Sequence, residues 1–95
     1  ATIHGITTVP HASNNAIGIA ASLQIVATLP DATRSPSVPD PLLEYGIDEN
    51  PNRGRRLVDP PRIEDGWFPV PGGPGLGIEI DEEYLRSAAI EHVRG

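Results

Sequence analysis

The stretch from Ile6 to Leu29 limits the possible folds more than any other part of the chain. It consists of a β-branched run at 6–9, then Pro10 and His11, and then a long apolar segment. β-Branched residues favour extended backbone. A proline cannot donate to a strand ladder, and it holds the preceding residue out of the helical region. The pattern therefore predicts a strand over 6–10, with His11 just beyond its carboxyl end.

The apolar segment that follows predicts a helix over 14–29, with Ser13 or Asn14 as its N-cap and Pro30 ending it. Its polar side chains form only a narrow strip, made of Ser22, Gln24 and Thr28. A helix that is apolar on nearly all sides is normally covered by neighbouring elements. We therefore expect this helix to be buried on most of its surface.

A second short strand is predicted at 42–45, after a proline-rich connection at 31–41. Strand, helix and strand in this order form a βαβ unit, which requires parallel pairing and a right-handed crossover. The predicted fold class is therefore α/β. In such folds ligands bind at the carboxyl ends of the strands, which makes His11 the first candidate functional residue.

The ends of the chain carry further local signals. Residues 1–4 read as the end of a helix, with Gly5 in the left-handed position that commonly follows a helix C-terminus. Asp65-Gly66 predicts a hairpin turn between Ile63 and the segment 67–70. Residues 71–77 are predicted to form a constrained link. Asp81 is predicted to cap a final helix, whose packed face would consist of Tyr84, Leu85, Ala88, Ala89 and Val93.

Composition excludes several classes of function. The chain has 13 acidic and 7 basic residues, a net charge of −6, which argues against binding nucleic acid or an anionic membrane. It has no cysteine for disulfides or thiolate metal sites, and no apolar run approaches the ~20 residues that span a bilayer. We expect a cytoplasmic protein. Only 4% of the residues are aromatic, and 10 Gly and 11 Pro leave few side chains for a core of its own. We therefore expect the chain to be part of a larger protein.

Four motifs occur in order: HGITTVPH (4–11), AIGIAASLQIVATLP (16–30), PLLEY (41–45) and DGWFPVPGGPGLGIEID (65–81). Together they resemble the C-terminal end of the enolase superfamily, in its mandelate racemase and muconate lactonising branch. The resemblance implies the last part of a (β/α) TIM-like barrel, with 6–10 and 42–45 as the seventh and eighth strands. Residues 1–56 would then end the barrel domain, and 57–95 would form a tail with a hairpin and a helix that pack near a capping domain.

The resemblance also implies a chemistry and two site residues. His11 matches the histidine that acts as general base or acid, and Glu44 matches the glutamate that binds the substrate carboxylate or the developing enolate. The cofactor implied is Mg²⁺, with its ligands on an upstream part of the enzyme and none in this chain. The partners implied are a small carboxylate substrate and the remainder of the barrel and capping domain, in a homo-oligomer.

The reaction implied is removal of a proton α to a carboxylate. Imidazole ionises near neutral pH, which suits a base for this step. We favour dehydration of a sugar acid such as an aldonate. A racemase or epimerase and a cycloisomerase remain alternatives within the same superfamily.

Other candidate features have simpler explanations. His4 and His92 lie near predicted helix ends, and the histidine spacing fits no usual zinc site. The glycines at 72–77 miss the dinucleotide-binding pattern and read as a rigid loop. A hypothesis of a different class is that the chain is a small, non-enzymatic interaction module that hides its apolar helix against a partner.

Overall fold

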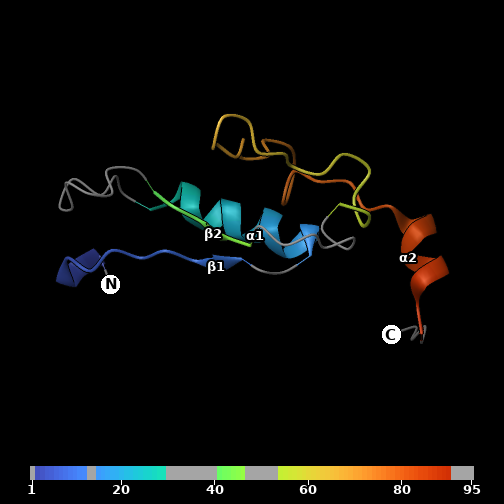
Figure 1. The fold of residues 1–95 in the computed structure, drawn as a ribbon, viewed down its shortest axis with the longest axis horizontal. Helices are drawn as coiled ribbons and strands as arrows, with labels where there is room; N and C mark the ends of the chain where they lie inside the picture. Colours follow the sequence, from blue (N-terminus) through green and yellow to red (C-terminus); the bar gives the residue numbers. More distant parts are fainter. Residues whose placement is uncertain (1, 13–14, 30–40, 47–53, 91–95) are drawn as a thin grey trace.

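The computed structural model describes residues 2–12, 15–29, 41–46 and 54–90. Along the chain these form a 3₁₀ helix η1 (Thr2–His4), strand β1 (His11–Ala12), helix α1 (Ala16–Ala27), strand β2 (Glu44–Tyr45) and helix α2 (Glu82–Ala88). Figure 1 shows α1 beside the two strands, a long irregular segment running along them, and α2 at one end of the molecule. The α/β class predicted from the sequence is confirmed for this part of the chain.

Strands β1 and β2 form a parallel pair, as the βαβ pattern predicts. His11 is opposite Glu44 and Ala12 is opposite Tyr45. The amide of Glu44 also donates to the Pro10 carbonyl over 2.9 Å, which extends the pairing by one residue. His11 is therefore the first residue of β1, and not just beyond the carboxyl end of the strand as predicted.

The predicted strand bounds were wrong, since β1 includes none of residues 6–10 and β2 excludes Leu42 and Leu43. A strand exists only where a partner supplies hydrogen bonds, and β2 is too short to reach back along residues 6–9. At the start of the chain, η1 followed by Gly5 at φ 69° confirms the predicted helix end and left-handed glycine.

The N-cap of α1 is Asn15, not the predicted Ser13 or Asn14, which lie outside the described residues. The Asn15 side chain accepts from the amides of Ile17 and Gly18 at 3.0 and 3.2 Å. This satisfies two of the amide groups that a helix leaves unpaired at its start. The helix ends at Ala27, two residues before the predicted end, and Pro30 lies in a range that the structure does not describe.

The buried face of α1 carries the core. Its buried side chains recur at helical spacing: Ala16, Ile19, Ala20, Leu23 and Val26. Ile19 and Leu23 form a cluster with Ala12 of β1, against which Leu43, Tyr45 and Phe68 pack. Among the other residues of α1, only Ile25, which is 55% exposed, and Ala27 are open to solvent, so most of the helix is at least partly covered, as expected.

The hairpin turn predicted at Asp65-Gly66 is confirmed. Both residues have positive φ, at 51° and 83°, which is the conformation of a two-residue turn that matches strand twist. Glu64 and Trp67 exchange two backbone hydrogen bonds of 2.8 and 2.9 Å across it. The ladder stops at this one pair because Pro69, two residues further, has no amide hydrogen to donate.

The segment from Leu57 to Ile80 is closed by a contact that no local pattern predicts. Leu57 and Ile80 form an antiparallel bridge, and Val58 donates to the Glu79 carbonyl over 3.0 Å. The segment is tied to α1 by Gln24, whose side-chain amide donates to the carbonyls of Pro71 and Leu76 at 2.9 and 3.4 Å. A polar residue on an apolar helix thus anchors the glycine-rich turn.

The predicted final helix forms as α2, and the Asp81 side chain caps it by accepting from the Tyr84 amide at 2.9 Å. Its predicted packed face is only partly correct. Tyr84 and Leu85 are half-buried, but Ala88 and Ala89 are exposed because α2 stands at the end of the molecule (Figure 1). Val93 lies outside the described residues.

The glycine-rich turn gives a test of this packing. Gly77 has φ +69°, and a Cβ there would lie 2.8 Å from the Pro71 side chain and 2.9 Å from the Gly73 amide nitrogen. We expect Gly77→Ala to lower the free energy of unfolding of the intact protein by about 2 kcal/mol or more, because strain and overlap act together. Urea unfolding measures this.

Two matched variants separate the causes. Gly75 also has positive φ but has open space around its Cβ position, so Gly75→Ala should cost about 1 kcal/mol. Gly72 has neither feature, and Gly72→Ala should leave stability within about 0.5 kcal/mol of the original. Equal stability of the Gly77 and Gly72 variants would show that the turn is not packed as described.

Candidate functional site

The two site residues expected from the sequence lie side by side. His11 and Glu44 are partners in the register of the parallel strands, and the His11 Nδ1 lies 3.0 Å from the Glu44 Oε2. Their side chains are 66% and 63% exposed, so both are open to solvent. An ion pair this exposed contributes little to stability.

Alternation along the strands separates the pair from the core. Successive strand side chains point to opposite faces. Ala12 and Tyr45, the next residues along each strand, belong to the core side, with Ala12 fully buried and Tyr45 half-buried. His11 and Glu44 therefore share the open face of the sheet, and the packed face fixes where they stand.

The contact defines the chemistry that the imidazole can perform. A neutral imidazole carries its hydrogen on one nitrogen only, and a carboxylate oxygen can only accept. The tautomer that bonds to Glu44 therefore has its hydrogen on Nδ1 and its lone pair on Nε2. An imidazole oriented in this way has the form of a general base at Nε2, and after protonation it can act as an acid.

The structure describes one other histidine. His4 ends η1 and is exposed, and His92 lies outside the described residues. Among the residues that the structure describes, no three His, Asp or Glu side chains gather as metal ligands. Mg²⁺ needs several oxygen ligands, and the pair supplies a single carboxylate, so these residues do not fit a magnesium centre.

Residues 71–77 form an irregular turn, in which the Gly77 amide donates to the Pro74 carbonyl over 3.0 Å, so the predicted loop is present. None of the helices in the described ranges is long and apolar enough to cross a membrane.

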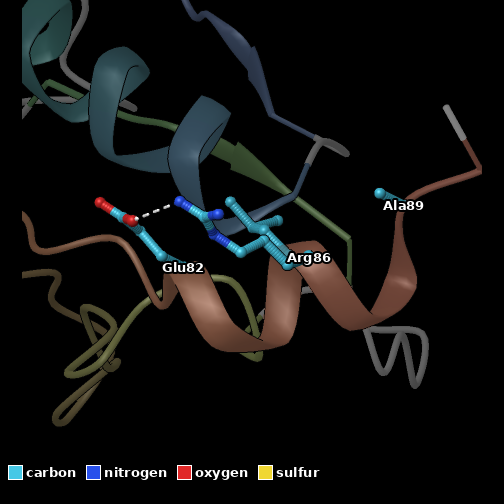
Figure 2. Close-up of a pocket in the computed structure, with 4 residues that line it drawn as sticks. Glu82, Arg86 and Ala89 are labelled. Atoms are coloured by element: carbon cyan, nitrogen blue, oxygen red, sulfur yellow. Dashed lines mark hydrogen bonds and ion pairs between the residues drawn. The ribbon is translucent and has the colours of Figure 1, made fainter. Parts of the chain in front are cut away.

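A hollow elsewhere on the molecule offers less chemistry. It has a volume of 360 Å³ and lies along α2, lined by Glu82, Leu85, Arg86 and Ala89. Figure 2 shows that its two charged side chains point toward each other, and they pair at 3.3 Å. Because these charges are already paired and the rest of the lining is apolar, the candidate site remains the His11–Glu44 pair.

Sequence reasoning identified both members of the pair but not the groups that hold them. Tyr45 and Phe68 stack edge to face, with ring centroids 5.1 Å apart and an interplanar angle of 73°. This contact joins β2 to the hairpin segment. Both aromatic residues stand in ordinary strand and hairpin patterns, so the sequence gives no separate signal for their contact.

Comparison with known proteins gives the relationship. The family model described as enolase C-terminal domain-like matches residues 1–84. D-galactarolactone cycloisomerase of Agrobacterium fabrum is 40% identical over 86 residues, which cover 90% of this chain and 22% of that enzyme. The chain thus spans about a fifth of the length of this curated relative. Its family match agrees with the motifs around His11 and Glu44, and the chain belongs to the enolase superfamily as a segment of the enolase C-terminal domain-like family.

Proposed function

We propose that this chain is part of an enzyme that removes a proton α to the carboxylate of a small sugar acid, with His11 as the group that moves the proton. The observation that carries the proposal is the 3.0 Å contact between the His11 imidazole and the Glu44 carboxylate on the open face of the sheet. The family match supports the superfamily chemistry, and the geometry supplies an oriented imidazole for it.

In this proposal Glu44 has two tasks. Its Oε2 accepts from His11 Nδ1 at 3.0 Å, which selects the tautomer whose lone pair is on Nε2. A carboxyl group has a second oxygen, which allows Glu44 to hydrogen-bond the substrate carboxylate or the enolate at the same time. Proton abstraction is then coupled to binding through one side chain.

We further propose that the chain forms the end of a (β/α) barrel, with β1 and β2 as neighbouring strands. Residues 1–56 would belong to the barrel, and 57–95 would be the tail that packs near a capping domain. The parallel pairing and the placement of α1 between the strands in sequence support this. Mg²⁺ is expected in the complete enzyme, held by residues other than the pair described here.

Two reactions follow from loss of an α-proton, and they differ in what leaves the β-carbon. In an open sugar acid a β-hydroxyl leaves as water, which is the dehydration favoured by the sequence. In the monolactone of a sugar diacid, the ring oxygen on the carbon β to the free carboxylate leaves and the ring opens; the leaving oxygen stays in the molecule and a proton is returned, so the reaction is an isomerisation. The similarity to a galactarolactone cycloisomerase favours the lactone as the second candidate substrate.

The first test is an assay of the intact enzyme with Mg²⁺ on three substrates: an aldonate, an aldarate and the monolactone of that aldarate. Product mass separates the reactions, because dehydration lowers the mass by one water and ring opening leaves it unchanged. We expect a keto acid from at least one of them. Turnover of neither class, with no exchange of the α-proton for solvent deuterium, would contradict the proposed function.

His11→Asn tests the proton transfer. The change keeps a polar side chain on β1 but removes the ionisable ring, so we expect turnover to fall about 10²- to 10⁴-fold with the fold retained. His4→Asn is the matched control, because His4 is an exposed histidine in η1. Circular dichroism would confirm folding in both variants. Unchanged turnover in His11→Asn would remove the imidazole from the mechanism.

Glu44→Gln tests the second member of the pair. The amide keeps the volume of the carboxylate but loses its charge and one acceptor, so kcat/KM should fall at least about tenfold. Glu82→Gln breaks a similarly exposed ion pair on α2, between atoms 3.3 Å apart, and should leave kcat/KM unchanged. If both variants have the same activity, the Glu44 contact has no role in the reaction.

A further inference from the structure

The strand pair that positions His11 and Glu44 is short, so its stability depends on the side chains that pack against its buried face. Each strand has two residues, and two-residue strand pairs are marginal without further packing. A shift of β2 by one residue would turn Glu44 to the packed face and move its carboxylate away from His11. Some contact behind β2 must hold the register.

Phe68 supplies that contact. Its ring meets Tyr45 edge to face at 5.1 Å, and both rings pack with Leu43 against the Ala12, Ile19 and Leu23 cluster. Tyr45 directly follows Glu44 along β2, and its strand partner is the buried Ala12, which directly follows His11. The Phe68 contact thus acts one residue away from each member of the pair.

The position of Phe68 is itself fixed from both sides. Before it, the Asp65-Gly66 turn closes the bridge between Glu64 and Trp67. After it, Gln24 of α1 holds the Pro71 carbonyl at 2.9 Å. The ring is therefore carried by a segment anchored to the same helix that covers the sheet.

We propose that Phe68 is a positioning residue for the reaction: through Tyr45 it holds β2 in the register that keeps the Glu44 carboxylate against His11. This inference rests on the proposed function of the pair. It assigns a role in the active site to a residue of the hairpin, more than 20 positions beyond Glu44 in the chain.

The test is kinetic and uses the intact enzyme at a temperature well below its unfolding transition. Phe68→Leu keeps an apolar side chain but removes the ring edge, and kcat should fall about 10- to 100-fold, as expected for a small misplacement of reacting groups. Phe68→Tyr keeps the aromatic ring, and this variant should retain most of the original kcat. Trp67→Leu, which removes a 62% exposed ring from the same hairpin, is the control and should leave kcat unchanged.

A double-mutant cycle with Glu44→Gln identifies the route of the effect. If Phe68 acts through Glu44, Phe68→Leu should have little further effect on kcat once Glu44 is changed. Additive losses, or a normal kcat in Phe68→Leu, would overturn the inference. If Phe68→Leu does not fold, the same double-mutant cycle is measured with Phe68→Met, because the flexible methionine side chain can fill irregular space.

The cycle also separates this inference from the proposed function. Loss of activity in Glu44→Gln together with a normal Phe68→Leu leaves the His11–Glu44 chemistry intact and removes only the positioning role. Normal activity in Glu44→Gln removes the proposed role of the pair, and the Phe68 inference falls with it.

Discussion

The parallel pairing of β1 with β2 is the interaction on which the rest of this structure depends. It consists of two residue pairs and one further hydrogen bond, from the Glu44 amide to the Pro10 carbonyl. Because strand side chains alternate, this single register decides that His11 and Glu44 share one face and that Ala12 and Tyr45 share the other. Fold and candidate chemistry are thus set by the same few contacts.

The packed face of the sheet is supplied by two elements of different character. Helix α1 contributes aliphatic side chains at regular spacing, and the hairpin segment contributes one aromatic ring. Gln24 connects the two elements, because its amide bonds carbonyls of the glycine-rich turn. A polar side chain on an apolar helix here orders an irregular segment that has little regular secondary structure of its own.

The open face places an imidazole and a carboxylate together without burying either. Forming such a pair costs little desolvation free energy, because both groups stay hydrated, and the pair remains accessible to a substrate. Its functional meaning comes from orientation, because the carboxylate selects the tautomer of the ring. An oriented imidazole of this kind is what the proposed proton transfer would require.

The sequence by itself determined the features that depend on neighbouring residues. Asp65-Gly66 forces a tight turn because both residues tolerate positive φ, and Asp81 caps α2 because its carboxylate reaches an amide three residues on. The order of strand, helix and strand could likewise be predicted. His11 was a candidate from its own sequence context, whereas Glu44 was expected only from the resemblance to the family.

Only the tertiary structure decided how far each strand extends and which distant groups meet. A strand ends where its partner ends, and the contact of Phe68 with Tyr45 joins segments that no local pattern relates. Forming such a contact closes a long loop and costs chain entropy. The rest of the packed structure must offset that cost, so the contact cannot be predicted from local sequence.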